Sequence, residues 1–379
     1  MTYSMRLLCA VIVFSAVACV HTQTPAGLVH EVRFNDLVIT GDLELDKLND
    51  EELFAQGTSF YAAEEYDHAA RYFGRVADFH ANSKHRRQAL YNAGLSLTKL
   101  KQWDDALARF QELSDPARGL GDSLDAAFQA ALVLFHLERF SEAVDILRTI
   151  GDRADVGPNK RLEARVQQGV CEVEVGLPTG QFDIAEKTLR DALAYWQALS
   201  DKDLVDDYSP SQAQFYLGEI FRLHYESVIL DGSKDTEKLA QDLEYKSELL
   251  LSSQGHYLRA IRMGNGYWAT ASGQRIGNLY ENMYEHMINA PTPSDLDARE
   301  KDTYKSELRK KIRVLITKAI TVYERTLEAA ERIGSVSPFV EETKQSLARM
   351  KELLLAEAKS DETPEPPPPP PPAGNKPRS

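Results

Sequence analysis

Three stretches in the first half of the chain share one pattern of small, aromatic and apolar positions. Each has a small residue nine positions before an aromatic one, then an alanine three positions later and a large apolar residue four positions beyond that. The copies are Gly57, Tyr66, Ala69 and Phe73; Gly94, Trp103, Ala106 and Phe110; and Ala131, Phe140, Ala143 and Leu147. Successive copies lie 37 residues apart. A fixed period with small residues where two helices touch predicts stacked helical hairpins.

This pattern resembles tetratricopeptide repeats, whose usual period is about 34 residues. The resemblance covers roughly residues 50–195. A fourth copy keeps Gly169, Phe182, Ala185 and Leu189 but has about four extra residues in its turn, around Pro178. Such repeats are binding scaffolds with many different partners. The resemblance therefore implies a fold and a manner of binding rather than one particular function.

Beyond Trp196 the period is lost and longer amphipathic segments follow. Small residues gather at 269–277, where they would let another helix approach closely. Apolar residues spaced by three and four from Tyr304 to Ala330 predict one long helix over about 294–334. The predicted fold is all-α, with a superhelix of about four repeats at 49–199 and a bundle of longer, repeat-like helices at 200–359.

Two terminal segments differ from this helical pattern. Residues 29–45 are strand-like, and they either pack on the first hairpin or add to the sheet edge of a partner. Residues 360–379 include seven consecutive prolines at 366–372, so we expect a disordered tail. The tail serves either as a spacer or as a proline-rich ligand.

The first residues have the form of a secretory signal, with one arginine before a short apolar run over 7–14. The sequence Ala16-Val17-Ala18-Cys19 resembles a bacterial lipobox, which implies a signal peptide at 1–18, lipidation of Cys19 and a tether over 19–48. Ordinary cleavage near Ala18 and a misassigned start are the alternatives. With Cys9 removed and Cys19 lipidated, Cys171 would be alone and could form no internal disulfide.

Charge and motifs exclude several classes of function. The net charge of −14 argues against binding nucleic acid, which requires basic surfaces. No pair of His residues has the spacing of a zinc helix motif, and no nucleophile and base form a recognisable pair. We therefore expect no enzyme, no metal, no cofactor and no small-molecule substrate.

In repeats of the kind that this chain resembles, the first helix of each hairpin lines the concave surface. The resemblance places ten residues in such a peptide-binding groove: Phe54, Tyr61, Tyr91, Asn92, Leu95, Phe128, Gln129, Leu132, Phe135 and Gln167. Related co-chaperones hold a partner's terminal carboxylate with Lys, Arg and Asn at such positions, and only Asn92 matches here. The groove is apolar with amide groups, which suits a partner helix or an extended apolar peptide. Alternatively, the protein's own N-terminal segment or C-terminal helices fill it.

The combination resembles tetratricopeptide lipoproteins that support outer-membrane protein insertion, pilus secretin assembly or gliding motility. Residues 267–287 and 304–334 are most similar to the gliding-motility group. This resemblance implies a scaffold that is lipid-anchored in the outer membrane, faces the periplasm and binds other envelope proteins. Two alternatives stay open: a periplasmic factor that docks a peptidoglycan-modifying enzyme, and a cryptic hydrolase in the C-terminal region.

Overall fold

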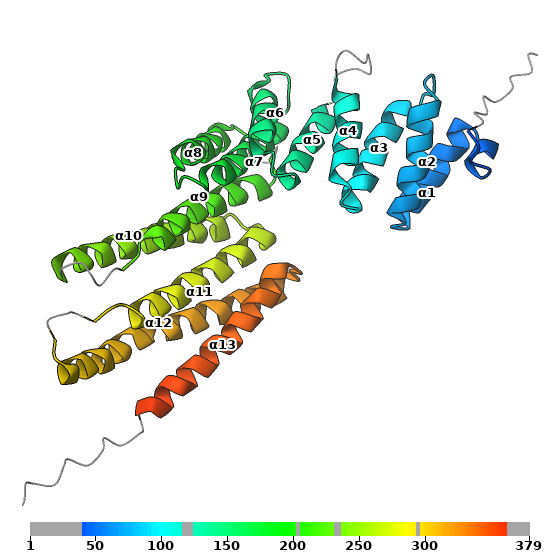
Figure 1. The fold of residues 1–379 in the computed structure, drawn as a ribbon. Coiled ribbons are helices and arrows are strands. Elements are labelled where there is room, and N and C mark those ends of the chain that lie inside the picture. Colours follow the sequence, from blue (N-terminus) through cyan, green and yellow to red (C-terminus); the bar gives the residue numbers. More distant parts are fainter. Residues whose placement is uncertain (1–39, 116–123, 202–204, 231–235, 293–295, 362–379) are drawn as a thin grey trace, which may run out of the picture.

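The computed structural model describes residues 40–115, 124–201, 205–230, 236–292 and 296–361. The described residues form thirteen α-helices that stack as successive hairpins (Figure 1), which confirms the all-α prediction. The helices are α1 (Asp50–Ala62), α2 (Tyr66–Phe79), α3 (Arg86–Lys99), α4 (Trp103–Ser114), α5 (Leu124–His136), α6 (Phe140–Asp152), α7 (Pro158–Gly176), α8 (Asp183–Ala198), α9 (Tyr208–Ser227), α10 (Thr236–Arg262), α11 (Gly266–Ile288), α12 (Ala298–Ile333) and α13 (Pro338–Asp361).

The small residues of the repeated pattern lie where the two helices of each hairpin touch. A Cβ atom on Gly57 would lie 2.9 Å from the Phe73 ring, and one on Gly94 would lie 2.7 Å from the Phe110 ring. Such distances are shorter than van der Waals contact, so a side chain here would push the second helix away. The third hairpin has Ala131 at the position of these glycines and the smaller Leu147 at the position of the rings, and both are fully buried.

The turns of the hairpins repeat as closely as their contacts. Glu64, Lys101 and Glu138 have φ angles of 62°, 59° and 57°, in the left-handed region. After each of them, the next backbone N–H donates to the carbonyl five residues earlier, as from Gln102 to Leu97 at 2.9 Å. This turn ends the first helix and directs the following aromatic residue into the second.

Two helices begin in different ways. Asn49 and Glu52 form a capping box at the start of α1, in which the Glu52 N–H donates to the Asn49 side chain at 2.9 Å. Ser141 does not cap α6, because this helix already begins at Phe140. The left-handed turn at Glu138 brings the chain into the helix one residue earlier than a serine cap would.

The longer C-terminal helices use the same close approach. A Cβ atom on Gly218 of α9 would lie 2.6 Å from the Tyr257 ring of α10. In the predicted small-residue stretch of α11, Gly273 and Gly277 lie directly against Thr326 and Tyr323 of α12. The hairpins therefore continue past residue 199, and the long helices stack beneath the array in Figure 1.

Two buried carboxylates join neighbouring hairpins of this C-terminal stack. Glu219 of α9 accepts hydrogen bonds from Tyr257 of α10 and from Arg275 of α11. Glu281 of α11 accepts hydrogen bonds from Tyr323 of α12 at 2.8 Å and from Arg349 of α13 at 3.1 Å. Each carboxylate thus contacts the partner helix of its own hairpin and the next hairpin. This arrangement fixes the order and spacing of the long helices.

The segment before α1 is fastened to α2. Arg71 forms ion pairs with Asp42 at 2.7 Å and Glu44 at 2.9 Å, and the Tyr72 hydroxyl donates to Glu44. Residues 40–48 form turns and a short 3-10 helix (Leu45–Lys47), with no strand. The rest of the predicted strand-like segment, the signal peptide with Cys19, and residues 362–379 of the proline-rich tail lie outside the described residues. Among the described helices, none has the length and hydrophobicity needed to span a membrane.

Candidate protein-binding surface

The ten residues of the predicted groove lie on the first helices of four consecutive hairpins. Nine of them are half-buried, and Phe128 is buried. They come from α1 (Phe54, Tyr61), α3 (Tyr91, Asn92, Leu95), α5 (Phe128, Gln129, Leu132, Phe135) and α7 (Gln167). Their role in binding a partner stays a prediction.

The half-buried rings of this surface are held from behind by the hairpin cores. Phe54 stacks on His85 with 4.6 Å between ring centroids and also contacts Phe73. Tyr91 meets Phe110 edge-on at 5.7 Å, and Phe135 meets Phe140 at 5.3 Å. Each ring therefore has a fixed orientation and still offers part of its surface to solvent.

Polar groups of the same surface connect one hairpin to the next. Tyr91 of α3 hydrogen-bonds to Gln129 of α5, and burial raises the pKa of its hydroxyl, so this phenol stays protonated at neutral pH. Gln167 of α7 donates to Gln212 of α9 at 3.0 Å. The amides are thus ordered by their neighbours, and each keeps further hydrogen-bonding groups for a ligand.

Phe128 lies in the core under a lysine of the next hairpin. Its ring is only 2% exposed, and the Lys160 ammonium of α7 lies 3.9 Å from the ring centroid. Lys160 also forms ion pairs with Glu163 at 3.1 Å and Asp125 at 3.7 Å. These contacts cover Phe128. A partner that binds this conformation of the protein would therefore contact the ion pairs of Lys160 and not the Phe128 ring.

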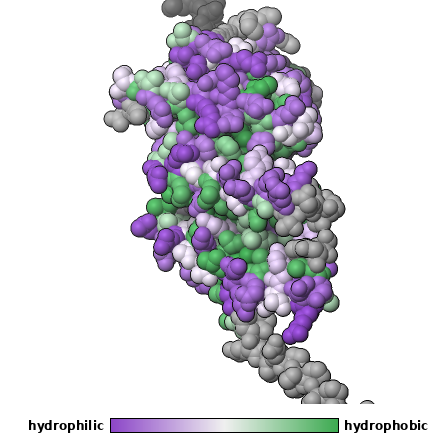
Figure 2. Space-filling model, turned by 90° about the vertical axis from the view of Figure 1, so that its left-hand side faces the viewer, coloured by the Kyte–Doolittle hydropathy of each residue, from purple (hydrophilic) through white to green (hydrophobic). Residues whose placement is uncertain are grey.

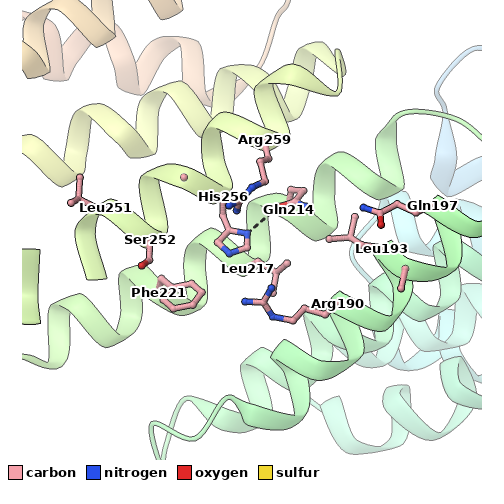
Figure 3. A pocket seen from close by; sticks show the side chains of 12 residues that line it. Arg190, Leu193, Gln197, Gln214, Leu217, Phe221, Leu251, Ser252, His256 and Arg259 are labelled. Atoms are coloured by element: carbon pink, nitrogen blue, oxygen red, sulfur yellow. Dashed lines mark hydrogen bonds between the residues drawn. The ribbon is translucent and has the colours of Figure 1, made fainter. Parts of the chain in front are cut away.

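Two hollows lie outside the predicted groove. One, of about 550 Å³, is lined by α8, α9 and α10 (Figure 3). The other, of about 310 Å³, is mainly apolar and lies between α10, α11 and α12. Figure 2 shows hydrophobic side chains scattered among hydrophilic ones over the lower half of one face of the molecule. No sequence motif indicated either hollow, because each depends on how three successive helices are placed in space.

The described part of the chain contains one cysteine, Cys171. Cys171 is buried, and burial raises the pKa of its thiol to about 12, so it remains protonated and weakly nucleophilic. Within the described ranges, no three His, Cys, Asp or Glu side chains cluster in a way that could hold a metal ion.

The family comparison agrees with this geometry. A tetratricopeptide-repeat family model matches residues 88–115, which span most of α3 and all of α4. Residues 88–115 are thus similar to one tetratricopeptide repeat. The hairpins before and after it share its small contact position, and two of them share its left-handed turn at a period of 37 residues.

Several solved structures align with most of this chain. A tetratricopeptide repeat protein from Parabacteroides merdae is 13% identical, with a TM-score of 0.36 over 80% of this chain and 98% of that one. Part of a repeat-containing protein from Cytophaga hutchinsonii is 11% identical, with a TM-score of 0.42 over 82% and 96%. The quorum sensor NprR from B. thuringiensis is 13% identical, with a TM-score of 0.43 over 82% and 87%. No curated protein matches the chain.

Proposed function

We propose that this protein is a non-catalytic scaffold that binds a helix or an extended apolar peptide of a partner protein along the first helices of its N-terminal repeats. The observation that carries the proposal is the row of ordered, half-buried aromatic and amide side chains on α1, α3 and α5. Successive hairpins present these groups at a regular spacing, as repeat scaffolds do when they bind an extended ligand.

The physical basis is the fixed orientation of the rings. Tyr91 and Phe54 are already packed against Phe110 and Phe73, so a partner that covers them loses little side-chain entropy. An aromatic anchor of this type contributes about 2 kcal/mol or more when it becomes fully desolvated. Gln129 and Asn92 beside them can hydrogen-bond the backbone of a bound segment and fix its register.

The proposed location is the periplasmic face of the outer membrane, where acyl chains on Cys19 would hold the scaffold within an envelope machine such as one for gliding motility or for outer-membrane or pilus assembly. The lipobox-like sequence before Cys19 supports this anchor. Replacing Cys19 with serine should move the protein from the detergent phase to the aqueous phase and abolish labelling by a fatty-acid probe. Equal partitioning of the two forms would refute the anchor without affecting the groove.

The groove is tested by filling it without disturbing the core. Ala55 of α1 is exposed, and Gln129 of α5 is half-buried and hydrogen-bonds Tyr91. The double variant Ala55→Arg, Gln129→Arg therefore places two long cations on the first helices, one of them beside Tyr91. We expect normal helical circular dichroism and loss of the protein that co-purifies with the unaltered scaffold. The affinity should fall about thirtyfold or more if one anchor is lost, because 2 kcal/mol corresponds to that factor.

A matched control carries the same charges on second helices. Gln111 of α4 and Thr149 of α6 are both exposed, so Gln111→Arg, Thr149→Arg should leave partner binding unchanged. Retention of the partner by the groove variant, or equal loss by the control variant, would contradict binding along α1, α3 and α5.

A further inference from the structure

The hollow between α8, α9 and α10 lies apart from the predicted groove. Its residues come from the second helices of two successive hairpins, α8 and α10, with α9 between them (Figure 3). Its volume of about 550 Å³ is within the range of pockets that hold a small molecule or a few residues of a bound peptide. The lining residues include Arg190 of α8, Gln214, Leu217 and Phe221 of α9, and His256 and Arg259 of α10.

The charge of this hollow is opposite to that of the whole protein. The chain has a net charge of −14, yet the lining residues include two arginines and no Asp or Glu. Arg190 is paired with Glu186 of its own helix at 2.6 Å. Arg259 is exposed and, within the described part of the chain, has neither a carboxylate nor a hydrogen-bond partner. The guanidinium of Arg259 is therefore available for an anionic ligand, and the guanidinium of Arg190 lines the same hollow.

The ring of His256 lies near both arginines. Its ring is buried between them in Figure 3 and hydrogen-bonds through Nδ1 to Gln214 at 2.9 Å. Burial and then the positive charges of Arg259 and Arg190 lower the pKa of His256 to about 4, so the ring is neutral at physiological pH. The neutral ring adds no charge of its own, so the two arginines supply the positive charge that an anion would meet in this hollow.

The walls beside the arginines are mixed, with an apolar part next to polar side chains such as Gln197, Gln214 and Ser252. Phe221 stacks on His256 with 5.4 Å between centroids, and Leu217 and Leu251 line the same cavity. A ligand with a charged end and an apolar body would therefore place each part against matching side chains. A planar carboxylate suits the fork of a guanidinium, which can donate two parallel hydrogen bonds to it.

The geometry points to this hollow as a second binding site, which takes an organic carboxylate attached to an apolar group, with the carboxylate at Arg190 and Arg259 and the apolar group against Phe221 and Leu217. Such a carboxylate can come from a free small acid or from an acidic side chain of a peptide. The site does not depend on the groove, because its residues lie on other helices.

Two matched probe pairs test the site by calorimetric titration of the purified protein. The first pair is 4-phenylbutyrate and its uncharged amide, 4-phenylbutanamide. The second pair is the capped dipeptide acetyl-phenylalanyl-glutamate amide and the corresponding glutamine compound. We expect the charged member of at least one pair to bind about tenfold more tightly than its neutral counterpart, which corresponds to roughly 1.4 kcal/mol. The pair that shows this preference identifies the source of the carboxylate.

Variants then test whether the tighter binding of the charged probe depends on the two arginines. Arg190→Gln, Arg259→Gln should remove it, and the control Lys187→Gln, Arg262→Gln, which deletes two exposed cations on the same two helices but outside the hollow, should keep it. Equal binding of charged and neutral probes to the unaltered protein would overturn the proposal, as would no binding of any probe. A preference that survives in the double arginine variant would overturn it too. The comparison of probes on the unaltered protein holds even if a variant fails to fold.

Discussion

Gly94→Ala tests whether the repeat period is set by helix contact. The new Cβ atom would lie 2.7 Å from two carbons of the Phe110 ring, whereas ordinary carbon contacts begin at about 3.5 Å. Phe110 is fully buried and cannot swing into solvent, so the helices must separate or the ring must leave its rotamer. Overpacking costs about 1–3 kcal/mol in general, and so short a contact with a ring that cannot move should cost about 2–3 kcal/mol. The better helix propensity of alanine returns about 1 kcal/mol. We expect a net destabilisation of about 1–2 kcal/mol.

Two further substitutions separate this effect from a general effect of removing glycine. Gly74 is also buried in a helix, but a Cβ atom there would lie 3.8 Å from the nearest atom, the end of the Arg109 side chain. Gly74→Ala should therefore stabilise the protein by about 0.5–1 kcal/mol through backbone entropy. Combining Gly94→Ala with Phe110→Leu recreates the Ala131 and Leu147 pair of the third hairpin. The double variant should lose less stability than the sum of the two single variants.

Urea unfolding followed by helical circular dichroism measures these changes. We expect a lower urea midpoint for Gly94→Ala, a higher one for Gly74→Ala and positive coupling between residues 94 and 110. A Gly94→Ala variant as stable as the unaltered protein would refute the claim that this glycine is required by the ring opposite it.

Two other predictions concern the turns and pH. Lys101→Gly should stabilise the protein by about 0.5–1 kcal/mol, because glycine adopts the left-handed φ of 59° at this position without strain. Gln102→Gly should not stabilise it, because Gln102 has an ordinary φ of −86°. Thermal melts of the two variants compare these effects. For His256, a folded-state pKa of about 4 against an ordinary value of 6.5 means that the unfolded chain binds more protons between these pH values. Stability should therefore fall by about 2 kcal/mol between pH 7 and pH 5 through this residue. The fall should be smaller in His256→Gln, and an identical pH dependence in both proteins would contradict this assignment.

Much of the fold could be predicted from the small residues that lie where two helices touch. Gly57, Gly94 and Ala131 marked the closest approach within each hairpin, since large residues cannot occupy that position beside a buried ring. The small stretch that includes Gly273 and Gly277 marked the approach of α12 in the same way. Asn49 and Glu52 marked the start of α1 because a capping box has a local signature.

Other features had no local signature. Glu64, Lys101 and Glu138 are residue types that seldom adopt positive φ, so nothing in the sequence indicated the left-handed turns. Phe128 is covered by Lys160 of the next hairpin, and the repeat pattern describes contacts within a hairpin only. The exposure of a groove residue depends on how neighbouring hairpins meet. The hollow at His256 likewise depends on the placement of three helices.

The central claim is that partners bind along the first helices of the N-terminal repeats. Site-specific photo-crosslinking in intact cells tests it most directly, with a photoreactive phenylalanine analogue at Thr58 of α1, at Thr98 of α3 or at Gln111 of α4. Thr58 and Gln111 are exposed and Thr98 is half-buried, so none is a fully buried core position. The account predicts that Thr58 and Thr98 give a crosslink to the same protein and that Gln111 gives none. Absence of a common crosslink from α1 and α3, or the same crosslink from Gln111, would contradict it.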